Sequence, residues 1–238
     1  MRRLHLAVLL LITPALTLAK PIPRDRESDL LVEHWGTPVD PGGECRFRLD
    51  DGKLSIKIPG KPHVMSAEIG QTNGPRVLRD VEGDFIAEVR VSGPFPADPR
   101  SLIEGRWAFN GSGLLIWGDD KNYIRLERAR MHIPNGAWRC WANWELRQNA
   151  KASGGWNGNN ATLLEEAKTV TLRVVRKGDT FTGSYRLDGG AWQELAPMHV
   201  PLGKKLQVGV VALQNTAAGY EATFEALRIT LVPASGQK

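Results

Sequence analysis

Short segments in which apolar and polar side chains alternate every two residues recur along nearly the whole chain. Successive side chains of a strand point to opposite faces, so this period predicts strands with one buried face. Residues 45–49 and 54–58 alternate on either side of Asp50-Asp51-Gly52, which is the signature of a hairpin. Further strand segments follow at 85–91, 123–128, 170–174, 181–187, 206–213 and 220–232. The pattern restricts the chain to an all-β fold of many short strands, a sandwich or a barrel.

Three departures from plain alternation refine this expectation. Residues 113–117 form a continuous apolar run, which is typical of a strand buried on both faces. Between Phe224 and Leu227 the apolar phase slips, which predicts a β-bulge. The spacing of Thr162 and Glu165 matches a capping box, but the segment is long enough for one helical turn at most. We therefore expect little or no helix.

The N-terminus has the layout of a secretory signal peptide. Arg2 and Arg3 precede an apolar stretch at 4–18, which Pro14 interrupts and which is shorter than the roughly 20 residues of a membrane span. Small residues in the −3 and −1 places predict cleavage after Ala19. We therefore divide the chain into a signal peptide at 1–19, a flexible lead at 20–29, one domain at 30–233 and a tail at 234–238. The predicted location is secreted or periplasmic, without a transmembrane segment in the mature chain.

Charge and cysteine content add two further bounds. The formal net charge is +5, and the basic residues are spread through the chain instead of forming a patch, which argues against a nucleic-acid partner. Only Cys45 and Cys140 are present. In an oxidising compartment they could pair, and closing so long a loop would stabilise the fold by about 4–5 kcal/mol. Two free thiols are the alternative, and the sequence leaves both open.

Several motifs in order resemble one known family. They are residues 62–70, 73–78, 83–85, 113–128, 172–181, 188–192 and 208–212. Together they are similar to an uncharacterised concanavalin A-like family, the domain appended to some β-xylosidases and found in bacterial regulation-of-enolase-like proteins. The resemblance covers about 30–232 and implies a concanavalin A-like, two-sheet jelly-roll sandwich similar to legume lectins and β-glucanases. It implies less about function, because a fold does not fix an activity.

A catalytic site is not evident in the sequence. Sandwich glucanases place carboxylates two residues apart on one strand face, as in Glu-x-Asp-x-Glu, and no such run occurs. The pairs Glu165-Glu166 and Asp119-Asp120 are adjacent, so on a strand they would face opposite ways, and Glu127 stands alone among arginines. The histidines outside the leader are scattered without metal-ligand spacing; they are His34, His63, His132 and His199.

One turn is rich in oxygen ligands. Asp119, Asp120 and Asn122 are weak candidates for binding calcium, which takes oxygen ligands. Aspartate and asparagine are also ordinary turn-forming residues, and the spacing of an EF-hand is missing. We therefore predict no cofactor, with calcium as the alternative.

Tryptophan is the most suggestive residue type, with eight in the chain. Trp107, Trp117 and Trp192 lie in strand-like motifs and are expected in the core. Indole rings stack on the apolar faces of sugars, and neighbouring amides bind hydroxyls. A three-residue spacing places Trp141 and Trp144 on opposite strand faces, so at least one of the two should be buried. The candidate glycan-binding residues are Trp141 or Trp144 with Trp156, Asn157 and Asn159.

The sequence therefore predicts a secreted, non-catalytic, lectin-like carbohydrate-binding protein. Two alternatives stay open: an envelope or extracellular domain that binds a protein or serves a structural role, and a glycoside hydrolase-related enzyme. The sequence makes no prediction about the oligomeric state.

Overall fold

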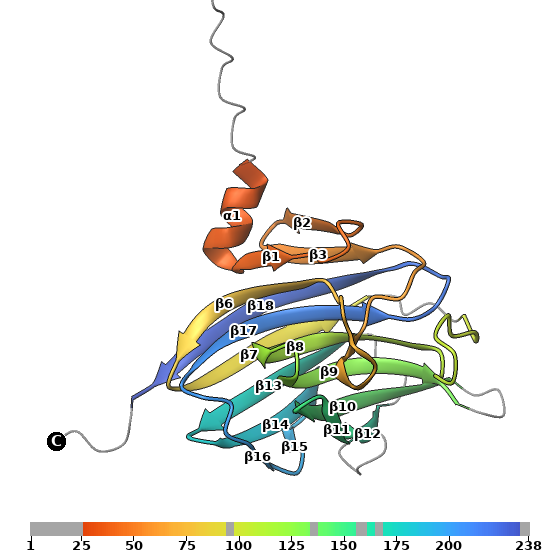
Figure 1. Cartoon of the computed structure of the whole chain (residues 1–238). Helices are drawn as coiled ribbons and strands as arrows, with labels where there is room; N and C mark the ends of the chain where they lie inside the picture. The colour runs from red at the N-terminus through yellow and green to blue at the C-terminus, as the bar shows by residue number, and fades with distance from the viewer. Residues whose placement is uncertain (1–25, 94–97, 134–137, 156–160, 165–168, 234–238) are drawn as a thin grey trace, which may run out of the picture.

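The computed structural model describes residues 26–93, 98–133, 138–155, 161–164 and 169–233. Within these ranges, two antiparallel sheets of eight strands each pack face to face as a sandwich (Figure 1). The predicted all-β, two-sheet architecture is thereby confirmed. No helix in the described part of the chain has the length and apolar character that a membrane crossing requires.

One sheet, here called sheet A, contains three neighbouring strands of 11 residues each, β8, β9 and β10. Its strands in spatial order are β1 (Thr37–Val39), β6 (Arg76–Glu82), β17 (Lys205–Gln214), β8 (Phe109–Asp119), β9 (Asn122–His132), β10 (Trp138–Gln148) and β11 (Lys151–Gly154), with β12 (Ala161–Leu164) also paired to β10. Residues 161–164 are therefore a strand, and the helical turn predicted there is wrong. Pairing with β10 satisfies the backbone of this segment in the sheet.

The facing sheet, sheet B, carries the hairpin predicted from 45–58. Its spatial order is β15 (Gln193–Glu194), β14 (Thr180–Leu187), β13 (Thr169–Lys177), β7 (Asp84–Ser92), β18 (Tyr220–Val232), β3 (Lys53–Ile58) and β2 (Arg46–Asp50), with β16 (Met198–His199) paired to β14. The register of β18 on β7 shifts between Glu225 and Arg228, where Ala226 has a φ of 52°. The predicted bulge is thus confirmed.

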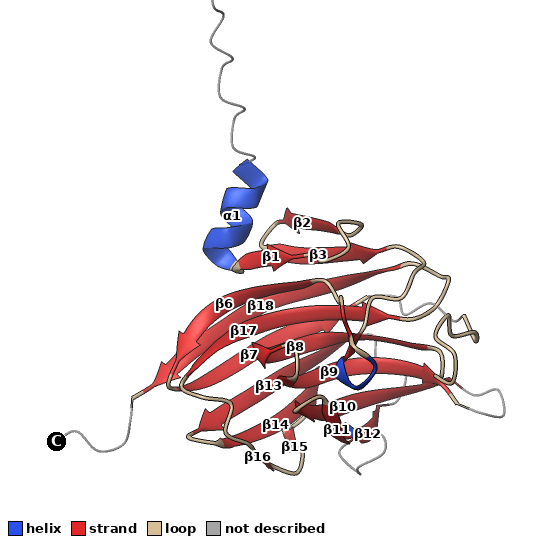
Figure 2. Ribbon diagram, viewed as in Figure 1, coloured by secondary structure: helices blue, strands red, loops and turns tan. Residues whose placement is uncertain are grey.

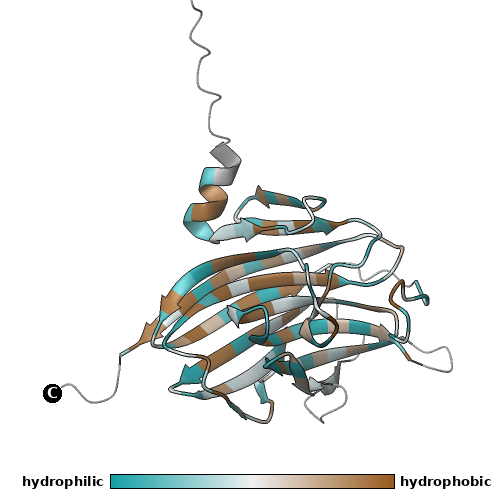
Figure 3. Cartoon of the chain, in the orientation of Figure 1, coloured by the Kyte–Doolittle hydropathy of each residue, from teal (hydrophilic) through white to brown (hydrophobic). Residues whose placement is uncertain are grey.

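Alternation places one face of each sheet in a common core. In β7, for example, Phe85, Ala87, Val89 and Val91 are fully buried, whereas the residues between them are only partly buried. Figure 3 shows the resulting change between apolar and polar residues along the strands. The core also receives Leu31 and Trp35, from and just beyond helix α1 (Arg26–His34). This helix includes residues 26–29, which belong to the segment predicted as a flexible lead.

Strand β8 is buried on both faces, as its continuous apolar run predicts. Leu114 and Ile116 face the core between the sheets, while Leu115 and Trp117 belong to a second apolar cluster on the outer face of sheet A. A segment formed by β4 (Met65–Ser66), η1 (Ala67–Ile69) and β5 (Gln71–Thr72) covers this cluster, and Figure 2 shows η1 in front of sheet A. The covering segment creates a second, smaller interior outside the sandwich.

The two cysteines are free, which is the second of the two alternatives that the sequence left open. Cys140 points into the core from sheet A, and its Sγ lies 3.9 Å from Nη2 of Arg128. Cys45 lies just before β2 in sheet B, and its amide donates to Oδ2 of Asp40 over 2.7 Å. Each thiol therefore has its own set of neighbours, in separate sheets.

Candidate functional site

The outer face of sheet A carries a central group of charged side chains. Because the even-numbered residues of β9 and β10, such as Leu126 and Trp144, fill the core, the odd-numbered residues face outward. The register places Glu127 opposite Asn143 and Arg125 opposite Glu145. Two carboxylates thus come together from neighbouring strands.

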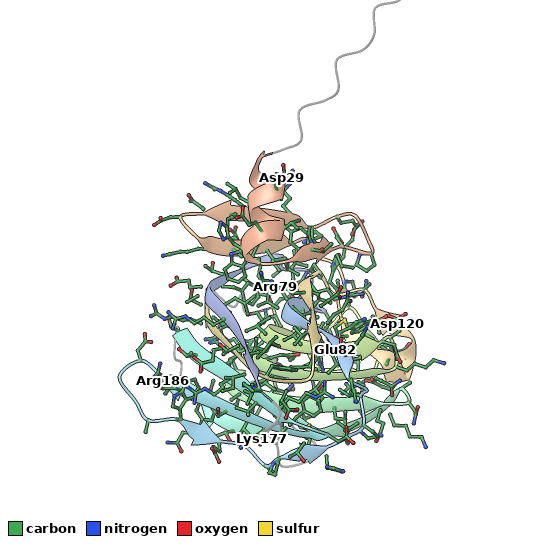
Figure 4. All side chains as sticks on the ribbon, turned by 90° about the vertical axis from the view of Figure 1, so that its left-hand side faces the viewer. Asp29, Arg79, Glu82, Asp120, Lys177 and Arg186 are labelled. Atoms are coloured by element: carbon green, nitrogen blue, oxygen red, sulfur yellow. The ribbon has the colours of Figure 1, made fainter. Side chains whose placement is uncertain are left out.

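Two arginines hold these carboxylates. Nε of Arg125 lies 3.1 Å from Oε1 of Glu127, and its Nη2 donates to Oε2 of Glu145. Nη1 of Arg147 also donates to Oε2 of Glu145, over 3.2 Å. Glu127 is fully buried, and glycine at 111 leaves room for it, since a Cβ there would come within 2.7 Å of Glu127 Oε2. The six charged residues labelled in Figure 4 are, by contrast, all exposed.

The network continues to the covering segment. Nε of Arg147 donates to Oε2 of Glu68 in η1 over 2.7 Å, and Nη2 of Arg106 donates to Oε1 of the same carboxylate over 3.1 Å. The backbone amide of Ala67 donates to the hydroxyl of Tyr123 over 3.1 Å. These bonds fix η1 over the sheet, and the residues just before it, Val64 and Ser66, line a cleft.

We call this space the outer cleft; it has a volume of about 380 Å³. Its polar floor comprises Arg125, Asn143, Glu145 and Arg147. Trp107 and Phe109 line it too, and Trp107 is 39% exposed. The backbone here is held by Asn215, whose Nδ2 donates to the Trp107 carbonyl and whose Oδ1 accepts from the Phe109 amide, both over 2.8 Å. An aromatic wall and a polar floor therefore meet in one concave site.

The two carboxylates have opposite protonation tendencies. Burial raises the pKa of Glu127 to about 7, and the negative charge of Glu145 acts in the same direction against the opposing attraction of Arg125 and Arg147. For Glu145, burial alone would raise the pKa, but Arg125 and Arg147 outweigh it and lower the pKa to about 2. Near neutral pH, Glu145 is ionised, whereas Glu127 keeps its proton to a higher pH than an ordinary glutamate.

This arrangement predicts a specific pH dependence of stability. Since the pKa of Glu127 is raised above its ordinary 4.5, the free energy of unfolding should fall as pH rises from about 4.5 to 7. The glutamine of Glu127→Gln stays neutral at every pH, so the free energy of unfolding of this variant should not fall in this way. Relative to the wild type, it should rise by roughly 1–3 kcal/mol across that window. Urea unfolding at pH 5 and pH 8 measures it. Equal losses in both proteins would contradict the assignment; Glu145 titrates below this window.

The structure sorts the predicted glycan-binding tryptophans. Trp144 is fully buried, its Nε1 donates to the Ala196 carbonyl over 3.1 Å, and Gly183 packs against its ring. Trp144 is therefore a core residue, and its proposed contact with a glycan is wrong. Trp141 faces outward and is half-buried, so the opposite facing of the two indoles is confirmed. Trp156, Asn157 and Asn159 lie outside the described residues.

The three tryptophans expected in the core divide as well. Trp117 is buried, as predicted, but it lies in the outer apolar cluster and not in the core between the sheets. Trp192 is half-buried beneath the guanidinium groups of Arg173 and Arg186, at 3.7 and 4.7 Å from the ring centre. The expectation that Trp107 lies in the core is wrong, because it is exposed at the outer cleft.

The calcium candidates form the turn between β8 and β9. Oδ1 of Asp119 accepts from the Lys121 amide over 2.7 Å and from Asn122 Nδ2 over 2.9 Å. Oδ1 of Asp120 instead accepts from the hydroxyl of Thr72 over 3.2 Å. The oxygens of Asp119 thus satisfy donors of the turn itself, which accounts for these residue types without an ion.

Sequence reasoning missed the pairing of Glu127 with Glu145. An alternating pattern of carboxylates occurs along a single strand, whereas Glu127 and Glu145 lie on the two paired strands of one hairpin, β9 and β10. The register of that hairpin was the signal that could have found them. Sequence reasoning also missed Trp107 and Asn215, which meet only through the packing of loops.

A two-sheet sandwich with an outer cleft is the class of molecule that these observations define. A model of the family described as "Protein of unknown function (DUF1349)" matches residues 154–231. No curated protein matches the chain. A functionally unknown protein from Saccharomyces cerevisiae is similar in structure, with a TM-score of 0.62 and 17% identity over 82% of this chain and 96% of that one.

Parts of larger chains are similar as well. The GH43 protein BlXynB from Bacillus licheniformis has a TM-score of 0.56 and 13% identity over 78% of this chain and 34% of its own. A xylan β-1,4-xylosidase from Bacillus halodurans C-125 has a TM-score of 0.54 and 13% identity over 81% of this chain and 40% of its own. The chain thus spans well under half of these two proteins, and the likeness concerns the fold.

Proposed function

We propose that this protein is an exported, non-catalytic carbohydrate-binding protein and that the outer cleft holds the sugar. The observation that carries the proposal is the exposed indole of Trp107 beside a floor of Asn143, Glu145 and Arg147. The apolar C–H face of a pyranose stacks on an indole, while amide and charged groups bind the hydroxyls. One wall of the cleft suits the first contact, and the floor suits the second.

The position of the carboxylates favours binding over cleavage. Glycoside hydrolysis requires one carboxylic acid that reaches the glycosidic oxygen and a second carboxylate on the other side of the bond. Glu127 has the raised pKa of an acid, but it is fully buried and does not line the cleft. Glu145 lines the cleft but is held ionised by two guanidinium groups. Neither supplies an accessible proton, so we infer that the pair orders the floor instead.

Export is part of the proposal and rests on the sequence of residues 1–19. A protein-interaction or structural role is the main alternative, and it would not require the cleft. Because parts of a xylan β-1,4-xylosidase resemble this chain, xylo-oligosaccharides are the first probes to try, followed by other soluble plant and bacterial glycans.

The test combines affinity electrophoresis on glycans with two tryptophan variants. Trp107→Ala should weaken binding at least about tenfold, because truncating a central aromatic contact costs about 2 kcal/mol. Trp192→Ala is the matched control, since it removes a half-buried indole in the loop before β15, beside sheet B, and it should bind like the wild type.

Two outcomes would contradict the proposal. Binding that survives Trp107→Ala unchanged would move the sugar away from the outer cleft. Release of reducing sugar by the wild type, lost in Glu145→Gln, would instead favour the hydrolase alternative.

A further inference from the structure

A second cluster of functional groups lies in the loops that connect β1 to β2 and β3 to β4, away from the floor of the outer cleft. Asp40 follows β1, Cys45 precedes β2, and His63 lies between β3 and β4. One ligand atom from each of these residues lies within 4.8 Å of the other two. Asp40 and Cys45 flank one short turn, and folding brings His63 from a separate segment beside them.

The hydrogen bond of His63 fixes which of its nitrogens is available. The ring is 2% exposed, and its Nδ1 lies 3.0 Å from the carbonyl oxygen of Lys61. A carbonyl only accepts, so Nδ1 carries the proton and Nε2 presents a lone pair. Nε2 lies 3.8 Å from Oε2 of Glu44, too far for a hydrogen bond. Metal-binding histidines characteristically have their second nitrogen bonded to a backbone carbonyl in this way.

The carboxylate of Asp40 is oriented in a similar manner. Its Oδ2 accepts the Cys45 amide over 2.7 Å, while its Oδ1 is buried without a hydrogen-bond partner among the described residues. The pKa of the Cys45 thiol is raised to about 12, first by burial and then by Asp40 and Glu44. Two carboxylates beside a partly buried thiol are an arrangement that a bound cation would neutralise.

We propose that Asp40, Cys45 and His63 bind a divalent transition-metal ion of the zinc type, with Glu44 as the fourth ligand. A thiolate, an imidazole and carboxylates together suit a borderline-soft ion and not calcium, which takes oxygen ligands. On binding, the metal replaces the thiol proton, which passes to solvent, and the sulfur coordinates as thiolate.

The surrounding chain can accommodate the ion. Bond lengths of 2.0–2.3 Å place tetrahedral donors about 3.3–3.8 Å apart, so the cluster must contract by about 1 Å. The turn between Asp40 and Cys45 contains Gly42 and the exposed Gly43, which has a φ of 65°. Glycine gives this turn the freedom to close.

The site would have a structural role. It would join the turn before β2 to the segment that begins at His63 and continues through Val64, which lines the outer cleft. The backbone of His63 is itself paired with Gln214 of β17. A bound ion would therefore fix the entry of the covering segment without touching a sugar.

The test is metal titration of the purified protein after reduction and removal of metals by chelation. Calorimetry with Zn²⁺ should show one equivalent bound. Titration with Co²⁺ should produce the near-ultraviolet charge-transfer absorption of a cobalt–thiolate bond. A fully reduced protein that takes up neither ion would overturn the proposal.

Variants assign the site. Cys45→Ser should abolish the cobalt–thiolate absorption and weaken Zn²⁺ binding on the order of 100-fold, since even outer-shell changes cost 10–100-fold. Cys140→Ala is the matched control, because it removes the other thiol, in sheet A, and it should keep both signals. Absorption that persists in Cys45→Ser, or that disappears in Cys140→Ala, would overturn the assignment.

A measurement on the wild type covers the case in which a variant does not fold. Cys45 should react with iodoacetamide more slowly in the presence of Zn²⁺ than in its absence, as mapped by mass spectrometry. Equal labelling rates would refute coordination by this thiol. The metal titration does not depend on a glycan, and glycan binding can be measured in metal-free protein. Failure of one proposal is therefore distinguishable from failure of the other.

Discussion

Replacement of Arg125 by methionine is expected to lower the free energy of unfolding at pH 7 by about 3–5 kcal/mol. Arg125 is the cation between Glu127 and Glu145, and its side chain is 5% exposed. Methionine keeps much of the volume but leaves two carboxylates facing each other without it. The deficit should shrink at pH 5, where Glu127 binds a proton. Urea unfolding with an unchanged m-value is the appropriate measurement.

Arg48→Met provides the control for this experiment. Arg48 also pairs with a carboxylate, that of Asp50, but the two side chains are 70% and 73% exposed. Such exposed pairs contribute about 0–1 kcal/mol, so this variant should unfold almost like the wild type. If Arg125→Met were equally mild, the buried network would not organise the floor of the outer cleft.

Replacement of Trp144 by alanine is expected to destabilise the protein by a similar amount, about 3–5 kcal/mol. The indole is fully buried between the sheets, and the backbone of Gly183 approaches so closely that a Cβ there would come within 2.9 Å of the ring. Alanine would leave a large cavity and remove the hydrogen bond to Ala196. Thermal or urea unfolding measures the loss.

Trp144→Phe separates a packing role from a binding role. Phenylalanine preserves an aromatic ring in the core and loses only the Nε1 hydrogen bond and part of the volume, so the stability loss should be smaller. Glycan binding by the folded variant should be unchanged. A folded Trp144→Phe protein that no longer binds glycan would reinstate Trp144 as a ligand-contacting residue, contrary to its burial.

The strands of this protein could be predicted because each is a local pattern. Alternation at 85–91 produced β7, the apolar run at 113–117 marked β8 as buried on both faces, and the phase slip after Phe224 marked the bulge in β18. Helix α1 was not predicted. Leu31 is its only described side chain in the core, with Trp35 following just beyond the helix, and so few buried residues do not make a recognisable helical repeat.

The candidate site could not be predicted in the same way. Glu127 and Glu145 are paired by the register of β9 on β10, and a one-residue change of register would turn either carboxylate to the other face. Trp107 reaches the cleft from a loop that Asn215 holds through two hydrogen bonds. Local patterns fix neither relation. The same holds for Asp40, Cys45 and His63, which share no spacing that a sequence motif would contain.

The central claim, that the outer cleft binds carbohydrate, is tested most directly by nuclear magnetic resonance of the tryptophan indole N–H groups during titration with xylo-oligosaccharides or the best-binding glycan. We predict that the Trp107 resonance shifts saturably, while those of Trp144 in the core and Trp192 in the loop before β15 stay in place. Saturable shifts at Trp192 with Trp107 unmoved, or no shift at Trp107 with any glycan that binds, would contradict it.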